Sequence, residues 1–369
     1  MTNRITVAQL VLSLELGGLE RLVVNFLSSI DREQFDITLG CLEGPGPLAA
    51  AVEALDITVT TFDRQPGIDW RLIPKISRWL KHERASILHT HNAAAHFYGA
   101  LGGKCAPTHC TIHTKHGRDW PDQPRKVMLN RISALFTHKL ITVSNDSREI
   151  ARTVERVPER KLAVIHNGID ADLFRPGERA GSSIPGVPDG AAVIGTVARL
   201  SPEKDQHTLL NAFVRLCELR DNCYLVIAGE GPAKTELAAH AGSLACSDRI
   251  IFLGAVEEVP ELLKRMTVFV LTSLTEGISL ALLEACATGV PAVVTDAGGN
   301  TEVVEHGVTG LVVPIKRPEL VAEKIDQLLT DEPLRAAMGQ KARERIVRHF
   351  SLASMTRQYE SLYRECHDR

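Results

Sequence analysis

The chain has 369 residues, of which 44% are hydrophobic and 24% charged, and its formal net charge is −3. This length is long for one core and suits two α/β domains, and the composition excludes a disordered chain. No uninterrupted apolar run reaches the ~18 residues of a membrane span, and Glu15 breaks the apolar stretch near the start. Neither a membrane span nor a signal peptide is therefore expected.

Eight cysteines are scattered along the chain, and none forms a CxxC pair. Cysteines in apolar surroundings behave as small hydrophobes, and this scatter does not suggest a disulfide framework. The sequence therefore predicts a reducing compartment, the cytoplasm.

The charge is uneven, because residues 1–175 carry 22 Lys and Arg against 19 Asp and Glu, and the remainder carries 20 against 26. The basic excess peaks between Lys104 and Lys139. One interpretation is an ordinary solvated helix face. The other is a peripheral contact with an anionic membrane, at its inner face, or with a phosphorylated acceptor.

Short β-branched runs alternate with longer amphipathic segments, which predicts parallel sheets covered by helices on both faces. The predicted strands of the first half are Ile5–Ser13, Phe35–Leu42, Ile57–Phe62, Ile87–His91, Cys110–His116 and Leu140–Ser144. Those of the second half are Ala192–Arg199, Tyr224–Gly229, Ile250–Gly254, Val268–Ser273, Pro291–Asp296 and Gly310–Pro314.

A segment rich in Gly, Pro and Ser, residues 176–190, predicts a linker between domains 1–175 and 191–348. Each part has the size of a doubly wound domain, in which ligands bind beyond the carboxyl ends of the strands. Two such domains facing each other would enclose a cleft. Residues 349–369 predict a C-terminal helix that crosses back to the first domain.

The most informative segment runs from Val268 to Pro291. A buried strand leads through the turn Glu276-Gly277 into a helix near Ser279, and Glu284 lies on an otherwise apolar stretch of that helix. A buried carboxylate needs hydrogen-bond donors, and both hydroxyls of a ribose can donate to one carboxylate. The helix start offers backbone N–H groups to a diphosphate.

A second loop, Gly195 to Gln206, follows the first predicted strand of the second domain and carries Arg199 and Lys204. Two cations at the end of a strand can bind a diphosphate and offset the charge that develops as it leaves. The alternative is a pair of solvated surface charges, which is more plausible for Lys204 than for Arg199.

In the first domain, Gly17 and Gly18 join the first strand to its helix and would let the backbone approach a phosphate or sugar. His116 ends a strand beside the basic stretch. The histidines His89, His91 and His113 lack a compact ligand spacing, so no metal site is expected.

Together these segments resemble the glycogen-synthase-like family of retaining glycosyltransferases, also called glycosyl transferases group 1, along nearly the whole chain. The residues that match its motifs are Glu276 and Glu284 of E-x7-E, Gly195, Arg199 and Lys204 of the donor loop, and Gly298, Gly299 and Glu302 of Gly-Gly-x-x-Glu. The segments Gly17–Glu20 and Thr114–Gly117 look most like bacterial exopolysaccharide-associated sugar transferases.

The resemblance implies a GT-B fold and retaining transfer of a hexose from a nucleotide diphosphate sugar to a glycan or lipid-linked acceptor, with no metal, no other cofactor and no nucleic acid. It assigns roles to Arg199 and Lys204 at the diphosphate, Glu284 at the ribose, Glu276, Gly277, Ile278, Ser279 and Leu280 at the sugar and phosphate, Gly17 and Gly18 over the diphosphate, and His116 at the sugar. Ile278-Ser279 departs from the usual aromatic and Pro or Gly, so the donor sugar and its base stay open.

Other functions remain on such a scaffold. A nucleotide-sugar epimerase normally lacks the paired glutamates, and a phosphorylase needs a pyridoxal lysine. A non-catalytic two-lobed binding protein is often exported, which the start of this chain does not suggest. A dinucleotide dehydrogenase would need the G-x-G-x-x-G fingerprint, which Gly17-Gly18 and Gly229-Glu-Gly do not provide.

Overall fold

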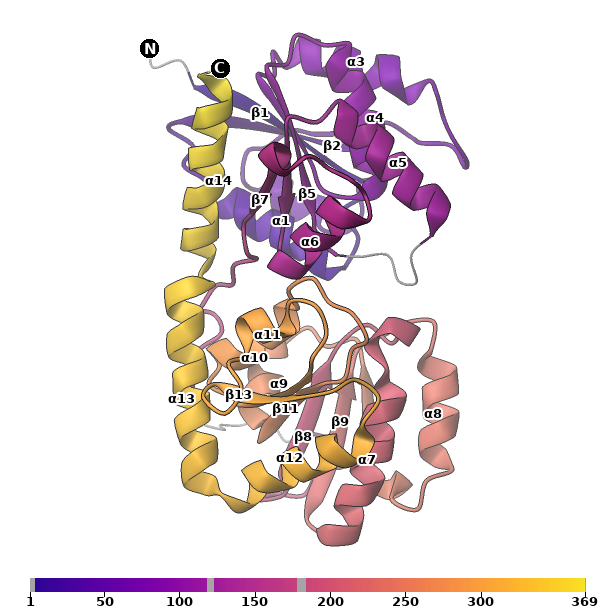
Figure 1. Cartoon of the computed structure of the whole chain (residues 1–369), viewed down its shortest axis with the longest axis vertical. Coiled ribbons are helices and arrows are strands. Elements are labelled where there is room, and N and C mark those ends of the chain that lie inside the picture. The colour runs from indigo at the N-terminus through magenta and orange to yellow at the C-terminus, as the bar shows by residue number, and fades with distance from the viewer. Residues whose placement is uncertain (1–3, 118–122, 178–183, 369) are drawn as a thin grey trace. The chain divides into compact units, whose positions relative to one another are not determined.

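The structure, a computed structural model, describes residues 4–117, 123–177 and 184–368. The chain divides into two compact units (Figure 1). Unit 1 comprises residues 1–168 and 352–369, and unit 2 comprises residues 169–351. Each unit is a parallel sheet with helices on both faces, as the alternation of strand and helix predicts.

Unit 1 contains a seven-stranded sheet in the order β3-β2-β1-β4-β5-β6-β7, in which every neighbouring pair is parallel. Its strands are β1 (Ile5–Val11), β2 (Phe35–Cys41), β3 (Val59–Thr61), β4 (Ile87–Thr90), β5 (Cys110–Lys115), β6 (Lys139–Thr142) and β7 (Leu162–Val164). The inner strands are buried almost continuously, as in a sheet covered on both faces, whereas the edge strands β3 and β7 are only partly buried.

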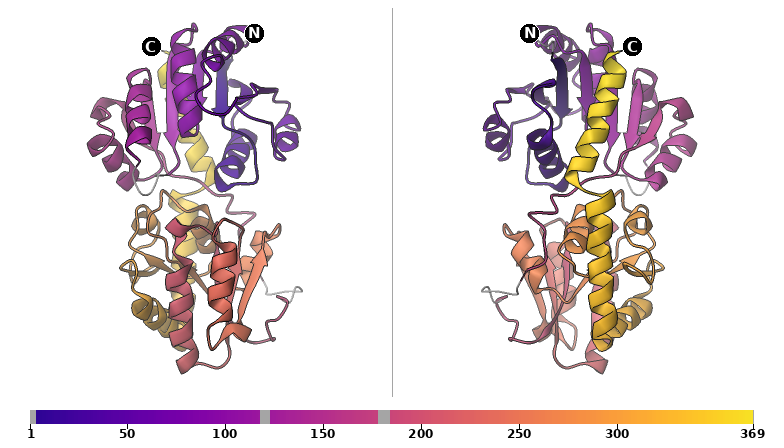
Figure 2. Two further views of the ribbon diagram at one scale, coloured as in Figure 1. Left: turned by 90° about the vertical axis from the view of Figure 1, so that its right-hand side faces the viewer. Right: turned by 90° about the vertical axis from the view of Figure 1, so that its left-hand side faces the viewer.

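The helices of unit 1 cover the two faces of this sheet (Figure 2). They are α1 (Gly18–Ser29), α2 (Ala49–Glu53), α3 (Leu72–His82), α4 (Ala93–Lys104), α5 (Pro124–Leu135), α6 (Asn145–Thr153) and α14 (Leu352–His367), with the 3₁₀ turn η1 (Glu159–Lys161). Asn92 and Ser144 cap α4 and α6 with side-chain oxygens, which satisfy backbone N–H groups of the first turns.

Helix α14 returns the C-terminal end of the chain to unit 1, where it packs on α1, β1 and β4 (Figure 2). Its buried face includes Met355, Tyr359, Leu362 and Tyr363. The rings of Tyr359 and Tyr363 contact Phe26, and Tyr363 also contacts Phe35.

Unit 2 contains a six-stranded parallel sheet in the order β10-β9-β8-β11-β12-β13. Its strands are β8 (Ala192–Val197), β9 (Cys223–Ala228), β10 (Ile250–Gly254), β11 (Val268–Leu271), β12 (Ala292–Thr295) and β13 (Gly310–Val313). Its helices are α7 (Gln206–Leu219), α8 (Lys234–Gly242), α9 (Val259–Arg265), α10 (Leu280–Ala287), α11 (Asn300–Val303), α12 (Pro318–Thr330) and α13 (Glu332–His349), with η2 (Pro202–Lys204) and η3 (Ser247–Arg249).

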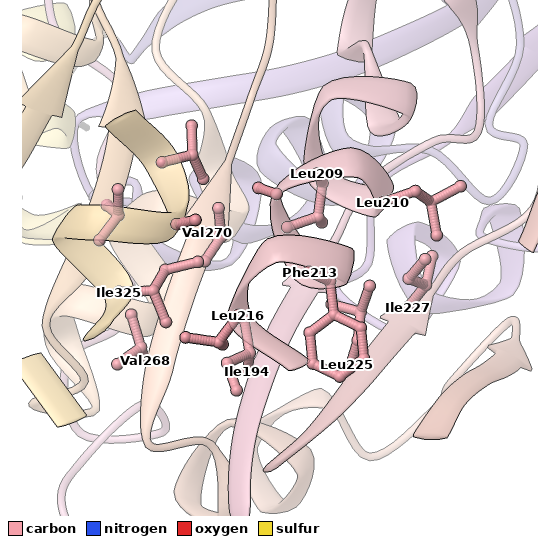
Figure 3. Close-up of a cluster of buried hydrophobic side chains, with 14 of the residues drawn as sticks. Ile194, Leu209, Leu210, Phe213, Leu216, Leu225, Ile227, Val268, Val270 and Ile325 are labelled. Carbon is pink, nitrogen blue, oxygen red and sulfur yellow. The ribbon is translucent and has the colours of Figure 1, made fainter. Parts of the chain in front are cut away.

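The core of unit 2 lies between the sheet and helices α7 and α12 (Figure 3). Phe213 and Leu216 of α7 are fully buried against Ile194 and Leu225 of the sheet, and Ile325 comes from α12. Burial of side chains of this size stabilises a fold by ~1.5–3 kcal/mol each. This core fixes the strand ends from which the loops of unit 2 emerge.

The boundary between the units lies at Gly168 and Ile169, not at residue 175, and the predicted linker belongs to unit 2. Arg343 of α13 donates to the carbonyl oxygens of Ala171 and Phe174, which holds residues 169–175 in unit 2. Of the linker, residues 178–183 lie outside the described residues, and Ile184 and Val187 are buried. The C-terminal part of the chain rejoins unit 1 at Leu352, not at residue 349 as predicted.

Candidate functional site

The strand order of unit 2 reverses between β8 and β11. Strands β9 and β10 extend the sheet beyond β8, whereas β12 and β13 extend it beyond β11. The connections after β8 and β11 therefore run to opposite sides of this point, at the carboxyl ends of the strands, which is where doubly wound sheets bind ligands. The loops that carry Arg199, Lys204 and Glu276 follow these two strands.

Arg199 lies on the loop after β8 with an exposed side chain. Its carbonyl oxygen accepts a hydrogen bond from Gln206 Nε2 at 2.9 Å, which fixes the backbone of the loop. Within residues 4–117, 123–177 and 184–368, its guanidinium has no hydrogen bond or ion pair. An exposed guanidinium on a braced backbone is available for a planar anion.

Lys204 and Glu276 form an ion pair, with 2.5 Å between Nζ and Oε1. Ser273 Oγ donates to the same carboxylate oxygen at 2.6 Å, and Glu276 is buried. The backbones of the two loops are also joined, because Leu274 N donates to Glu203 O at 2.8 Å. The structure thus brings together two side chains that lie 72 positions apart in the sequence.

A glycine pair holds the backbone of the Glu276 turn. A Cβ atom at Gly298, whose φ is +53°, would lie 2.1 Å from the carbonyl oxygen of Glu276, and one at Gly299 would lie 1.8 Å from that of Gly277. Real Cβ atoms do not approach oxygen so closely, so any side chain here would displace the turn. The Gly-Gly-x-x-Glu segment therefore packs directly against the backbone of the Glu276 turn and fixes its position.

Helix α10 begins directly after this turn. Ser279 is its N-cap, and Ser279 Oγ accepts from the backbone N–H of Leu282 at 3.4 Å. Ile278 and Ser279 are buried, and Glu284 lies half-buried on the helix. The backbone N–H groups of the first turn, from Leu280 onward, face the end of the helix where anions bind.

Gly195 has a packing role in the structure, and its predicted part in donor binding stays a prediction. It lies inside β8, where a Cβ atom would meet the Met266 side chain at 2.3 Å. The glycine therefore makes room for core packing and does not reach the carboxyl end of the strand. Sequence spacing from Arg199 could not reveal this, because Met266 comes from a distant part of the chain.

In unit 1 the strand order reverses between β1 and β4, and Gly17 follows β1 as the N-cap of α1. A Cβ atom at Gly17 would lie 2.2 Å from Glu20 Oε2, so the Glu20 carboxylate lies against the start of the helix. Burial raises the pKa of Glu20. Gly17 and Gly18 thus stand at the topological switch point of unit 1.

His116 follows β5 and lines a pocket of about 220 Å³ in unit 1. Its Nε2 lies 3.1 Å from Nδ1 of His91, and among the described residues its buried Nδ1 has no partner. Burial lowers the pKa of His116 to about 4, so the ring is neutral at pH 7. His91 was excluded as a metal ligand in the sequence, and its contact with His116 was not predicted.

The same pocket contains a buried ion pair that the sequence did not suggest. Lys115 Nζ lies 2.5 Å from Glu155 Oε1, and Asn130 Nδ2 donates to the same oxygen at 2.7 Å. Lys115 ends β5, and Glu155 follows α6, so only the fold brings them together. A carboxylate this deeply buried requires both donors.

The model of the family described as Glycosyl transferases group 1 matches residues 181–345, and that of Glycosyltransferase Family 4 matches residues 16–173. The chain is therefore a glycosyltransferase that carries a domain of each of these two families. The two matches lie in the two units and span nearly the whole chain, as the sequence motifs predicted.

Curated relatives of this glycosyltransferase align over most of its length. It is 28% identical to the UDP-Gal:alpha-D-GlcNAc-diphosphoundecaprenol alpha-1,3-galactosyltransferase of Escherichia coli, over 98% of this chain and 97% of that protein. It is also 28% identical to the N-acetyl-alpha-D-glucosaminyl L-malate synthase of Bacillus anthracis, over 84% and 82% of the two chains.

Solved structures confirm the fold. The crystal structure of Anabaena Alr3699/HepE in complex with UDP superposes with a TM-score of 0.84 at 21% identity and covers 98% of this chain and 100% of that one. A glycosyltransferase from Rickettsia africae superposes with a TM-score of 0.83 at 20% identity and covers 99% of each. The predicted GT-B class is therefore correct.

Two further properties concern the residues that the structure describes. Among them, no group of three His, Cys, Asp or Glu side chains is placed to hold a metal ion. None of the helices they form is both long and apolar enough to span a bilayer. His89, His91 and His113 instead make hydrogen bonds to neighbouring side chains.

Proposed function

We propose that this glycosyltransferase moves a hexose from a UDP-sugar to a lipid-linked glycan acceptor and retains the configuration at the anomeric carbon. The observation that carries the proposal is the meeting of Lys204 and Glu276 beside the exposed Arg199, at the topological switch point of unit 2. Arg199 and Lys204 supply cationic groups for a diphosphate, and Glu276 supplies a carboxylate for sugar hydroxyls. The two loops that carry these residues are joined by hydrogen bonds.

In the proposed reaction, an acceptor hydroxyl attacks the anomeric carbon as the bond from that carbon to the diphosphate oxygen breaks, on the same face of the sugar. The leaving diphosphate takes the hydroxyl proton. Arg199 and Lys204 stabilise the negative charge that develops on the diphosphate, without a metal ion. The N–H groups at the start of α10 face the phosphates, and Glu284 accepts from the ribose hydroxyls.

The Lys204–Glu276 ion pair suggests how the donor orders the site. A diphosphate competes with the Glu276 carboxylate for the Lys204 ammonium. When Lys204 turns to the phosphate, the Glu276 carboxylate keeps Ser273 as one donor and accepts further hydrogen bonds from sugar hydroxyls. Donor binding therefore replaces one ion pair by another, so the buried carboxylate is never left without donors.

The acceptor class is proposed from the end-to-end likeness to the Escherichia coli enzyme, whose name gives UDP-galactose as donor and a GlcNAc-diphosphoundecaprenol as acceptor. This likeness favours a polyprenyl diphosphate sugar over a small free acceptor, and a role in cell-surface polysaccharide synthesis. It also favours uridine as the base of the donor.

A thermal-shift panel of UDP- and GDP-sugars, followed by a transfer assay to α-GlcNAc-diphosphoprenol, tests the proposal. We expect one UDP-hexose to raise the melting temperature, because a ligand that binds only the folded state stabilises it. That donor should give a product whose new linkage is α by ¹H NMR. Transfer from no UDP-hexose, or a β linkage, would contradict the proposal.

We also propose that helix α5 contacts an anionic lipid surface. Met128, Ile132 and Leu135 lie on one face of α5 with exposed fractions of 55%, 36% and 72%. Exposed cationic side chains flank them at Arg125 and Arg131. Apolar side chains beside cations suit an anionic bilayer surface.

A basic pocket beside this helix supports the same partner. The pocket has a volume of about 240 Å³, and its lining includes Lys104, Leu135, Arg160 and Lys161 but no carboxylate among the described residues. Part of the predicted basic stretch, residues 118–122, lies outside the described residues.

Sedimentation with vesicles that contain anionic lipid, compared with vesicles of neutral lipid alone, tests this contact. The double variant Met128→Ser and Leu135→Ser should lose most vesicle binding, whereas Leu219→Ser, which removes an equally exposed leucine from α7 in unit 2, should not. Charge reversal at Arg125 should weaken binding more at low salt than at high salt. Equal binding by all variants would favour an ordinary solvated helix face.

A further inference from the structure

A continuous chain of buried hydrogen bonds leads from His116 to helix α14. We call it the polar chain, and its members in order are His116, His91, Gln9, Tyr363, His89, Thr114 and Tyr359. The successive distances between bonded atoms are 3.1, 2.7, 3.0, 2.6, 2.7 and 3.0 Å. It joins β1, β4 and β5 to the C-terminal helix inside unit 1.

Every histidine in the polar chain is neutral at neutral pH. Burial lowers the pKa of His89 to about 3, with a smaller contribution from His116, and lowers that of His91 well below its ordinary value. A neutral imidazole carries one proton, so one ring nitrogen donates and the other accepts. If one nitrogen of a ring donates, the other must accept, so the direction of one hydrogen bond determines the direction of the next.

The direction is set by the amide of Gln9. Its Oε1 faces His91 Nε2 and its Nε2 faces the Tyr363 hydroxyl. His91 Nε2–H therefore donates to Gln9, and His91 Nδ1 is left to accept from His116 Nε2–H. On the other side, Gln9 donates to Tyr363, whose hydroxyl donates to His89 Nδ1.

We propose that the polar chain holds His116 as the tautomer with its proton on Nε2, so that Nδ1 is an acceptor for a hydroxyl of a sugar in the pocket of unit 1 that His116 lines, and that Gln9 and Tyr363 are positioning residues for this acceptor. The tautomer follows from the hydrogen bonds alone, whereas the sugar hydroxyl rests on the proposed function.

The opposite direction of the polar chain is the physical alternative. If the Gln9 amide were turned over, it would donate to His91 Nε2, and every bond from His116 to Tyr363 would reverse. His116 would then carry its proton on Nδ1, which has no partner among the described residues. Buried N–H groups without an acceptor are rarer than acceptors without a donor, which favours the direction proposed.

Tyr363 is the member whose hydroxyl couples the Gln9 amide to His89. It is fully buried, and its ring packs on Phe35 and His89, so its hydroxyl is fixed between Gln9 and His89. Without that hydroxyl, a Gln9 N–H would lack an acceptor in the proposed direction, just as the His116 Nδ1–H lacks one in the reversed direction, so the preference between the two directions would be lost. The tautomer of His116 would then become a mixture.

Two-dimensional ¹H–¹⁵N spectra of the ligand-free protein, with ¹⁵N-labelled histidine, read the tautomer directly. We expect His116, assigned with a His116→Gln sample, to show an unprotonated Nδ1 and a protonated Nε2. In Tyr363→Phe both nitrogens should move toward averaged shifts, and kcat/KM for the donor sugar should fall about tenfold, the effect of one lost hydrogen bond. Gln9→Met breaks the polar chain between His91 and Tyr363, and it should change the His116 shifts and kcat/KM in the same way as Tyr363→Phe.

Tyr98→Phe is the matched control, because the buried Tyr98 hydroxyl accepts from a backbone N–H in unit 1 outside the polar chain. It should leave the His116 tautomer and kcat/KM unchanged. A protonated Nδ1 in the wild-type protein, or an unchanged tautomer in both Tyr363→Phe and Gln9→Met, would overturn the inference. Absence of sugar transfer with the expected spectra would contradict only the proposed function.

Discussion

Mild acid should unfold unit 1 before unit 2, because unit 1 contains a cluster of neutral buried histidines. Burial lowers the pKa of His89 and His96 to about 3 and that of His116 to about 4, and it lowers the pKa values of His91 and His113 well below the ordinary value. For the described histidines of unit 2, no comparable burial occurs.

The sign follows from proton uptake. Each of these histidines has a lower pKa in the folded than in the unfolded state, so below pH 6.5 the unfolded chain binds more protons. The stability they contribute is complete above pH 6.5 and is lost as the pH falls toward the folded pKa. At pH 5 the loss is about 2 kcal/mol for each histidine, or roughly 6 kcal/mol for His89, His96 and His116 together. A typical domain has only ~5–15 kcal/mol in total.

Urea unfolding followed by tryptophan fluorescence at several pH values measures this loss. All three tryptophans, at positions 70, 79 and 120, lie in unit 1, and Trp79 is buried against Phe62. We expect the free energy of unfolding reported by fluorescence to decrease by more than 4 kcal/mol between pH 7 and pH 5, about two-thirds of the loss worked out above. Circular dichroism should show unit 2 still folded at urea concentrations that unfold unit 1.

Single substitutions provide the control. His96→Asn removes one titrating group, so the decrease between pH 7 and pH 5 should become smaller by about 2 kcal/mol. His207→Asn, at an exposed position in unit 2, should leave the fluorescence transition unchanged. A free energy of unfolding of unit 1 that stays constant from pH 7 to pH 5 would show that the buried histidines do not make unit 1 sensitive to acid.

Two further predictions concern the donor loops of unit 2. Gly299→Ala would place a Cβ atom 1.8 Å from Gly277 O, so we expect the protein to lose ~1–3 kcal/mol of stability and to bind UDP more weakly. The control Gly242→Ala, whose Cβ atom would have nothing within 4 Å, should change neither the stability nor UDP binding. Glu284→Ala should weaken UDP binding, measured by calorimetry, about tenfold, which is the effect of a lost hydrogen bond to a charged group. Glu236→Ala on α8 should leave the affinity unchanged. Equal affinities of the wild type and Glu284→Ala would remove Glu284 from the ribose site.

Much of the fold followed from local pattern. All twelve predicted strands are present, with ends within two residues of those predicted, because strands buried on both faces read as short β-branched runs. Strand β7 was not predicted, since Leu162–Val164 is too short to give a pattern. The domain boundary was misplaced because Arg343 holds residues 169–175 through bonds to Ala171 and Phe174, which lie 172 and 169 positions away, and composition records no such contact.

The candidate site divides in the same way. Glu276, Lys204 and Arg199 were predictable because each follows a strand, and the strand order then brings their loops to one switch point. The contact between His91 and His116 and the bonds to Gln9 depend on which strands are neighbours, so neither could be inferred from spacing. A contact that depends on which strands are neighbours leaves no pattern in the sequence around either residue.

The most direct test of the account is the single-turnover rate of sugar transfer by Arg199→Ala at saturating donor. Loss of a charge-stabilising group acting on the leaving diphosphate should lower this rate on the order of 10²-fold or more, while Lys234→Ala, which removes an exposed lysine of α8, should keep the wild-type rate. A near-wild-type rate for Arg199→Ala would contradict the central claim that the diphosphate leaves against this loop.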